Sequence, residues 1–501
     1  MRRARVAAAG LVAAVATVLG ACAPPPASGP ELATGNGPGG RAPGAGSDDP
    51  AVAPDWVAPT TDLPWAPCPA HRATDVPADA ELECAEHSGS TAVRLTTART
   101  PEQAPPLVVV GGPENPALEF GVRLATGGTE LTDAHPVVLL DHRGRGEAAG
   151  SCLTPDARYT LDHLADRGAD PGSPEARGAL ADASQACTDE LIGRELHFGS
   201  AHAAEDLETL RSAWDVPGLA VLGVGTGARV ALAYAAEHPD RLSRLALDSP
   251  APLEGDQEAA ARAALDGSDT ALRLWAAACG PEACGPEDAT TRVEAVTHAL
   301  DEARTPDAAV PAALLSDVVR AALADLAGAS SPTAGPGDRI LGELVAARDG
   351  EVPPSVRARA ADLSHDSLSY VAGCSDLPRR VPVNRVLELA DEWSENPPFG
   401  EILASQLAAC STWPVPTPTP LEVSGPTPVW LVSGVADPVA GAGTLEPTAG
   451  LLTAAGARDV RTVTWGAPGS RALLHSSCVR GELVGFLADP GAEESDAACP
   501  S

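Results

Sequence analysis

Short apolar runs bounded by turn-forming residues recur along the chain. Runs of this length predict strands that are buried on both faces of a sheet. They lie at 106–112, 136–141, 219–223, 245–248, 428–434 and, more weakly, 461–465. Apolar residues at helical spacing lie between and after them, at 203–214, 228–238 and 448–455. Strands that alternate with helices predict an α/β fold with a mostly parallel sheet and helices on both faces.

The pattern changes between about residues 254 and 414. This segment is rich in Ala, Leu and Arg at helical spacing, and it contains no convincing strand. It therefore predicts an inserted helical cap over the carboxyl edge of the sheet. The core of the fold would then consist of a first part, residues 61–253, and a C-terminal part, residues 415–501.

The amino terminus has the pattern of an export signal. Three arginines within the first five residues precede an apolar run at 6–19, which is short for a membrane span. The run ends in Leu-Gly-Ala before Cys22, which is similar to the lipobox of bacterial lipoproteins. We therefore predict a signal peptide at 1–21 and a lipid on Cys22 that anchors the exported protein to the extracytoplasmic face of the cell membrane. The alternative is an ordinary secretory signal followed by a chance cysteine. Residues 22–60, rich in Pro, Gly and Ala, predict a flexible tether.

The cysteines also favour an oxidising compartment. Eleven are present, and lipidation of one would leave ten. These fall as neighbours in sequence and predict five local bridges: Cys68–Cys84, Cys152–Cys187, Cys279–Cys284, Cys374–Cys410 and Cys478–Cys499. A metal site is disfavoured because no Cys-x-x-Cys pair and no adjacent histidine cluster occurs.

Charge and composition exclude several functions. The net charge is −34, and all 34 basic residues are arginine. An acidic chain is a poor electrostatic partner for nucleic acid. The absence of lysine excludes Schiff-base, P-loop and Ser–Lys chemistry. We expect no cofactor and no metal.

Several motifs together carry a family resemblance. The stretch 187–250 contains a strand, the turn Gly-Val-Gly-Thr-Gly and a helix, and it is preceded by Gly-Gly-Pro at 111–113 and Asp-His-Arg-Gly-Arg-Gly at 141–146. Cys-Ser-Thr-Trp-Pro at 410–414 and Gly-Val-Ala-Asp-Pro-Val at 434–439 follow. In this order they resemble the secreted tripeptidyl-aminopeptidase-like (TAP-like) α/β-hydrolases, relatives of proline iminopeptidase. The resemblance implies the α/β-hydrolase fold and a serine peptidase that releases short peptides from a free amino terminus, using Ser, Asp and His in that order.

The sequence departs from this pattern at the reacting groups. Gly225 stands at the nucleophile position, Asp437 is retained at the acid position, and Gly469 stands where the histidine is expected. Serine needs a histidine to take its proton, so both losses oppose hydrolysis. The oxyanion loop, Gly112-Pro113-Glu114, carries Glu where the family has Gly. A carboxylate ~4 Å from a developing oxyanion would oppose it by about 4 kcal/mol at an effective dielectric of ~20.

Other residues are weaker candidates for the missing roles. Thr226 adjoins the nucleophile position, but Val224 would be bulky in that turn. His475 would need its loop to fold back toward Asp437. Ser249 is more typical of a turn or cap residue, and His142 is more typical of a structural role.

Three functional hypotheses follow. The favoured one is a catalytically degenerate, lipid-anchored binding or accessory protein whose ligand is a peptide or an envelope protein. The second is an active serine-type exopeptidase that uses displaced groups such as Thr226 and His475. The third is a structural envelope protein whose cleft is filled by side chains.

Overall fold

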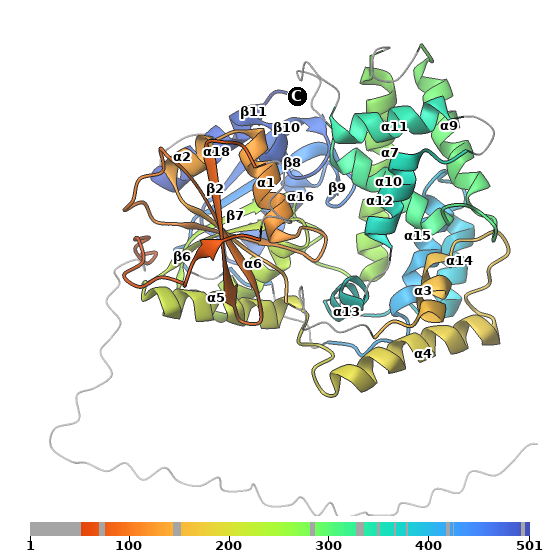
Figure 1. Cartoon of the computed structure of the whole chain (residues 1–501), viewed down its shortest axis with the longest axis horizontal. Coiled ribbons are helices and arrows are strands. Elements are labelled where there is room, and N and C mark those ends of the chain that lie inside the picture. The colour runs from red at the N-terminus through yellow and green to blue at the C-terminus, as the bar shows by residue number, and fades with distance from the viewer. Residues whose placement is uncertain are drawn as a thin grey trace, which may run out of the picture. The chain divides into compact units, whose positions relative to one another are not determined.

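The computed structural model describes the chain from residue 52 to residue 501 with short interruptions (Figure 1). The described ranges are 52–69, 76–143, 152–280, 286–326, 335–347, 351–364, 367–376, 379–416, 421–423, 425–491 and 496–501. The predicted signal peptide, Cys22, the predicted tether up to residue 51 and Cys284 lie outside these ranges.

The described strands form one sheet of eleven strands. They are β1 (Ala66–Pro67), β2 (Ala80–His87), β3 (Ser90–Thr97), β4 (Leu107–Gly111), β5 (Val137–Leu140), β6 (Leu219–Val224), β7 (Leu242–Asp248), β8 (Val429–Asp437), β9 (Gly441–Ala442), β10 (Val460–Pro468) and β11 (Ala497–Cys499). The order is β1-β2-β3-β5-β4-β6-β7-β8-β10-β11, with β9 paired to β8. Neighbours are parallel from β5 to β11, whereas β1, β2 and β3 form an antiparallel edge. The mostly parallel sheet is therefore confirmed.

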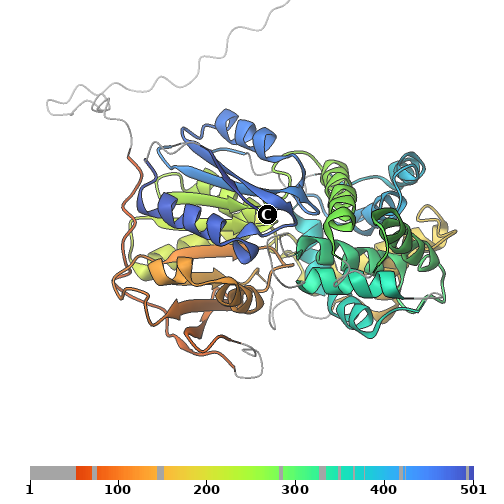
Figure 2. The ribbon, with the colours of Figure 1, turned by 90° about the horizontal axis from the view of Figure 1, so that it is seen from above.

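Helices cover both faces of this sheet (Figure 2). One face carries α1 (Ala117–Gly127), α2 (Glu130–Ala134), α17 (Ala472–His475) and α18 (Ser477–Ala488). The other carries α5 (Ser200–Trp214), α6 (Gly227–Glu237) and α16 (Leu445–Ala454). The adjacent strand residues Val221 and Leu222 belong to the two different hydrophobic clusters, because successive side chains of a strand point to opposite faces. The continuous apolar runs in the sequence are explained by this double burial.

The strands of the antiparallel edge, which mix buried and charged residues, escaped the sequence prediction. β2 and β3 form a hairpin joined by Ser88 and Gly89, both at positive φ (51° and 78°). Leu82 and Ala85 of β2 are buried, while Glu81 and Glu86 of the same strand are exposed. An edge strand of this kind has no continuous apolar run. β1, β9 and β11 are only two or three residues long and left no such signal either.

Between β7 and β8 the described residues form helices and connecting segments, without a strand. The helices are α7 (Gln257–Ala278), α9 (Ala289–Glu302), α10 (Ala312–Ala324), α11 (Pro336–Ala346), α12 (Pro354–Leu363), α13 (Ser367–Ser375), α14 (Val383–Trp393), α15 (Gly400–Gln406) and the 3-10 helix η1 (Leu407–Cys410). They share one hydrophobic cluster with α3 (Pro155–Asp162) and α4 (Pro174–Leu191), which precede β6 in the chain. We call all these helices together the cap; it is built from two separate stretches of sequence (Figure 1).

Four of the predicted disulfides lie within the described residues. They are Cys68–Cys84, Cys152–Cys187, Cys374–Cys410 and Cys478–Cys499. The second and third lie among the cap helices, whereas the fourth ties α18 to the edge strand β11. The sequence pairs Cys279 with Cys284, which lies outside the described ranges.

The segment just before β1 packs against the folded part. Trp56 Nε1 donates to the carbonyl of Pro106 at 3.0 Å, and Ser243 Oγ donates to the carbonyl of Asp55 at 3.3 Å. Pro106 precedes β4 and Ser243 lies at the start of β7, so this segment crosses the amino ends of the parallel strands. Residues 52–60, at the end of the predicted tether, thus contact the edge opposite the carboxyl ends. Among the described helices, none combines the length and the apolar character needed to span a membrane.

Candidate functional site

The sequence-predicted site residues gather at the carboxyl ends of the parallel strands. β4 leads into the oxyanion loop, β6 into Gly225, β8 ends at Asp437, and β10 is followed by Gly469. Because these strands are parallel, their carboxyl ends share one edge of the sheet, where open α/β sheets bind ligands. The fold therefore brings the candidate residues from distant parts of the chain to one place.

The turn between β6 and α6, residues 223–227, is a sharp strand-to-helix turn, which we call the elbow. Gly225 is buried and has φ of +60°, a left-handed conformation that costs a residue with a side chain about 1–2 kcal/mol. The turn packs closely, since a Cβ on Gly227 would lie 2.2 Å from the carbonyl oxygen of Val110. Gly225 has no side chain, so the elbow points no nucleophile toward the carboxyl edge.

The carboxylate of Glu114 fills the space in front of the elbow. Its Oε1 accepts from the backbone N–H of Thr226 at 3.1 Å, and both oxygens lie 2.8 Å from the Thr226 hydroxyl. Asn115 Nδ2 donates to the same Oε1 at 3.2 Å. A Cβ on Gly225 would lie 2.9 Å from Oε1, so Glu114 occupies the position next to the missing side chain.

This placement opposes acyl-transfer chemistry. In an α/β-hydrolase, the N–H of the residue after the nucleophile stabilises the oxyanion of the tetrahedral intermediate. Here that N–H belongs to Thr226 and already donates to a carboxylate. The Thr226 hydroxyl, a candidate substitute nucleophile, also donates to Glu114. A developing oxyanion would have to displace Glu114 or meet its negative charge.

Asp437 is fully buried at the end of β8. Its Oδ1 accepts from the backbone N–H groups of Val439 at 2.7 Å and Ala440 at 3.0 Å. The hydroxyl of Ser470 donates to the same oxygen. Burial raises the pKa of Asp437, and the hydrogen bonds from Ser470, Ala440 and Val439 counter this shift only in part. Among the described residues, Oδ2 has no hydrogen-bond partner.

Ser470 is a site residue that the sequence analysis missed. It is 2% exposed, and its hydroxyl donates to Oδ1 of the carboxylate that would orient a histidine in the serine hydrolases. Its position directly after Gly469 was the signal available in the sequence. A neutral serine cannot replace an imidazole as a proton acceptor, so the bond holds the loop without supplying a base.

Gly469 lies where the cap meets the core. It has φ of +128°, and its N–H donates to the carbonyl of Ala436 at 2.8 Å. A Cβ there would lie 3.3 Å from the carbonyl oxygen of Ala324, at the end of α10, and 3.4 Å from the ring of Trp465. The cap backbone thus closes one side of the position at which the sequence resemblance expects an imidazole.

His475 is the last residue of α17, further along the connection from β10 to α18 that contains Gly469. Its ring stacks on Trp465, with centroids 5.6 Å apart and an interplanar angle of 2°. Burial lowers its pKa to about 4, although the nearby Asp325 raises it in part. Its Nε2 is buried and has no partner among the described residues, and no hydrogen bond joins it to Thr226 or Asp437. The structure does not assemble Thr226, His475 and Asp437 into a hydrogen-bonded relay.

Asp248 and Ser249, at the end of β7, fix the loop after β10. Ser249 has φ of +54°, and its hydroxyl donates to Asp248 and accepts from the N–H of Arg471 at 2.8 Å. The Asp248 carboxylate accepts from the N–H groups of Ala472 and Leu473, each at 3.0 Å. Burial raises the pKa of Asp248 to about 6. Ser249 is thus a buried structural hydroxyl, as its turn position suggested.

Arg471 joins the cap to the oxyanion loop. Its Nη1 donates to Asn115 Oδ1 at 3.1 Å, and its Nη2 donates to Asp325 of the cap. Asn115 in turn donates to Glu114, which accepts from Thr226. A continuous line of hydrogen bonds therefore runs from the cap to the elbow. Arg471 is 356 residues from Asn115 and 146 from Asp325, so no local pattern could have predicted the pairing.

A cavity of about 720 Å³ adjoins this line of hydrogen bonds. Its lining comes from the oxyanion loop, α1, α12, α13 and the loop after β10. The lining residues are Pro113, Glu114, Asn115, Pro116, Glu119, Phe120, Arg123, Arg359, Asp362, Leu363, Ser369 and Arg471. Charges of both signs face it, and the volume lies within the usual range for small-ligand sites, about 300–1,000 Å³. The cleft beside the elbow is therefore only partly filled.

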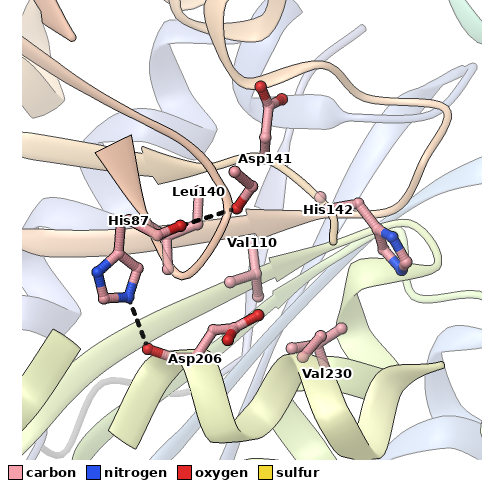
Figure 3. A pocket seen from close by; sticks show the side chains of 10 residues that line it. His87, Val110, Leu140, Asp141, His142, Asp206 and Val230 are labelled. Carbon is pink, nitrogen blue, oxygen red and sulfur yellow. Dashed lines mark hydrogen bonds between the residues drawn. The ribbon is translucent and has the colours of Figure 1, made fainter. Parts of the chain in front are cut away.

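His142 lines a second, much smaller cavity of about 10 Å³, shown in Figure 3. This volume is about that of a single water. The ring of His87 points toward Asp206, to whose carbonyl its Nε2 is hydrogen-bonded at 2.9 Å, while His142 Nδ1 bonds to the carbonyl of Arg143 at 3.1 Å (Figure 3). His142 is 5% exposed, which agrees with a structural role.

The described residues contain no group of three or more His, Cys, Asp or Glu side chains placed to hold a metal ion.

Comparison with known families identifies the class. Residues 111–295 match the family model described as "alpha/beta hydrolase fold", so the protein has the α/β-hydrolase fold. Residues 396–499 match the model described as "TAP-like protein". The chain thus has the α/β-hydrolase fold, and its C-terminal part is similar to TAP-like proteins, as the sequence motifs indicated. No curated protein sequence matches the chain.

Solved structures of low sequence identity also match the chain. A serine hydrolase from Cycloclasticus zankles is 10% identical with a TM-score of 0.37, over 83% of this chain and 100% of that one. A hydrolase from Pseudomonas aeruginosa PA01 is 16% identical with a TM-score of 0.36, over 81% and 98%. Epoxide hydrolase A from Mycobacterium thermoresistibile is 15% identical with a TM-score of 0.35, over 82% and 98%.

Proposed function

We propose that the protein is a catalytically degenerate TAP-like α/β-hydrolase homologue that acts in binding or as an accessory protein at the cell envelope. The observation that carries this proposal is the position of the Glu114 carboxylate beside the elbow. Its carboxylate takes the backbone N–H of Thr226, while Gly225 offers no nucleophile. A site that lacks a nucleophile and has a carboxylate on its oxyanion donor favours binding over hydrolysis.

The ligand proposed for the 720 Å³ cavity is a short peptide. The cavity presents carboxylates from Glu114, Glu119 and Asp362 and a guanidinium from Arg359, so both charged ends of a peptide have partners there. Arg359 forms no ion pair with another described residue, which leaves it available for a ligand carboxylate. This ligand class also agrees with the peptide substrates that the family resemblance implies.

Activity measurements test the catalytic part of the proposal. We expect the purified protein to leave tripeptide chromogenic substrates uncleaved and to form no covalent adduct with a fluorophosphonate probe. Turnover by the wild type that disappears in an Asp437→Ala variant would refute the proposal. It would instead support the second hypothesis, an exopeptidase with displaced groups.

Binding measurements test the ligand. Titration calorimetry with trialanine should give a measurable affinity that falls about tenfold in Arg359→Ala, as expected for one lost charged hydrogen bond. Arg339→Ala is the matched control, because Arg339 is an exposed cap arginine that does not line the cavity. Equal affinities for the two variants, or no binding by the wild type, would reject the peptide site.

The lipid anchor is a separate proposal. The Cys22 motif motivates it, and the packing of residues 52–60 on the amino ends of the strands is compatible with a tether that leaves the cavity edge accessible. Expression of a Cys22→Ser variant should move the protein from the membrane fraction to the soluble fraction. If both forms fractionate alike, the segment is an ordinary secretory signal.

A further inference from the structure

One buried carboxylate links the cap to the core. Asp325 follows α10 and lies between two arginines of the core, Arg123 of α1 and Arg471 of the loop after β10. Asp325 Oδ1 lies 2.7 Å from Arg123 Nη2, and Oδ2 accepts from Arg123 Nη1 at 3.3 Å. Arg471 Nη2 donates to the same Oδ1. The exposed fractions of the three side chains are 14%, 25% and 12%.

The two arginines keep this carboxyl group charged. Burial alone would raise the pKa of Asp325, but the charges of Arg471 and Arg123 outweigh it, and the pKa is lowered. Removing one partner of a buried ion pair leaves an uncompensated charge and is strongly destabilising. The contact between Asp325 and the core therefore resists separation of the end of α10 from the loop after β10.

Backbone contacts concentrate at the same place. The N–H of Ser470 donates to the carbonyl of Ala324 at 3.1 Å, directly beside Asp325. Arg320 Nη2, one turn earlier in α10, donates to the carbonyl of Pro438 at 3.2 Å. The end of α10 thus docks on the loops that follow β8 and β10, directly after Asp437 and next to Gly469.

The same ion pair forms part of the cavity wall. Arg123 and Arg471 both line the 720 Å³ cavity, and each is held in place by Asp325. Separation of Asp325 from the two arginines would free the Arg123 guanidinium from this ion pair and leave Arg471 bonded only to Asn115 Oδ1. The two arginines that Asp325 binds thus both belong to the wall of the cavity.

We propose that Asp325 is a latch that holds the cap closed on the core at the loop after β10. When the ion pair is broken, the end of α10 separates from the core and the cavity opens while the sheet stays folded. The latch does not depend on whether the site hydrolyses anything, because none of its contacts needs a nucleophile.

Hydrogen exchange on the full mature chain, followed by mass spectrometry, tests the latch. In Asp325→Asn, peptides covering 312–326 and 467–475 should exchange about a hundredfold faster than in the wild type, as expected for a broken buried pair. Peptides from β6 and β7 should keep wild-type exchange. Asp269→Asn is the matched control, since Asp269 pairs with Arg273 at 2.9 Å on the exposed face of one cap helix and bridges nothing.

Arg123→Gln removes only one of the two ion pairs of Asp325, because Arg471 remains its partner. It should give a smaller increase in exchange in the same two regions, so the proposal stays testable if Asp325→Asn folds poorly. Wild-type exchange at 312–326 in both variants would overturn the latch. Equal acceleration in the cap and the sheet would overturn it too, since that result describes global destabilisation.

Discussion

The elbow and the loop after β10 both present a glycine where the family resemblance expects a catalytic side chain, yet their surroundings differ. At the elbow, the nearest atom to a Cβ on Gly225 is the carboxylate end of Glu114, at 2.9 Å. At Gly469, the nearest atom is a backbone carbonyl of the cap, at 3.3 Å. A flexible side chain can turn away, whereas a helix end cannot move without the cap.

The two regions therefore differ in how easily they could be restored. The elbow keeps the turn geometry of a nucleophile-bearing loop, and one exposed side chain fills the space in front of it. The loop after β10 is fixed on several sides, through Ser470, Arg471 and the Asp248 carboxylate. Replacing Gly225 by serine tests how easily the elbow accepts a side chain, and replacing Gly469 by histidine tests the same for the loop after β10.

The largest effect is expected for Gly469→His. The backbone there has φ of +128°, and the Cβ would lie 3.3 Å from the carbonyl oxygen of Ala324. Strain at such a φ and crowding against the cap should together cost about 3 kcal/mol of unfolding free energy. Urea denaturation followed by circular dichroism measures this loss.

Gly481→His is the control for the histidine restoration. Gly481 is exposed in α18, and a Cβ there meets nothing within 4 Å. Its unfolding free energy should stay within about 0.5 kcal/mol of the wild type. If Gly469→His matches this control, the cap does not close the position and the comparison between the two regions fails.

The pH dependence of the unfolding free energy distinguishes two buried groups at the loop after β10, His475 and Asp248. Burial lowers the pKa of His475 to about 4, so its folding contribution is complete above pH ~6.5 and is lost toward pH 4, by about 3 kcal/mol. Burial raises the pKa of Asp248 to about 6, so its contribution is greatest below pH ~4 and falls by about 3 kcal/mol as the pH rises to 6. The two slopes oppose each other, so they partly cancel in the wild type between pH 4 and 6, while the raised pKa of the buried Asp437 adds a slope of the same sign as that of Asp248.

Two substitutions each remove one of the opposing pH dependences of the unfolding free energy. His475→Gln should make stability rise steadily as the pH falls from 6 to 4, because the Asp248 contribution remains. Relative to the wild type, Asp248→Asn should shift the profile toward lower stability at pH 4 than at pH 6, because the His475 contribution remains while that of Asp248 is lost. Denaturant melts at pH 4, 5 and 6 measure both, and parallel curves for the two variants would show that neither group titrates as its burial implies.

The sequence predicted β4, β5 and β6 because each is a nearly uninterrupted apolar run, as at Val137–Leu140, whereas the short parallel strand β11 left no such signal. It also placed Gly225 and Asp437 at strand ends, since the strands before them fix the register. It could not predict the contents of the site. Glu114 was located, but its direction depends on a hydrogen bond to Thr226, 112 residues away. The roles of Ser470 and Asp325 depend on how the cap docks, which leaves no periodicity in the chain.

The smallest effect is expected for Gly225→Ser. The φ of +60° should cost a serine about 1 kcal/mol, and its Cβ would force Glu114 Oε1 away from 2.9 Å. In a Glu114→Ala background the contact with Oε1 is gone, so the same substitution should cost less, and a double-mutant cycle in urea measures the difference. Gly225→Ala adds the same Cβ without a hydroxyl, so it is the control for the contribution of the hydroxyl. A restored hydroxyl should still react with no fluorophosphonate probe, because no described histidine is hydrogen-bonded to Asp437 or to Thr226 of the elbow. Labelling of Gly225→Ser would show that another group supplies the base, and it would make the elbow, rather than the loop after β10, the step at which hydrolysis was lost.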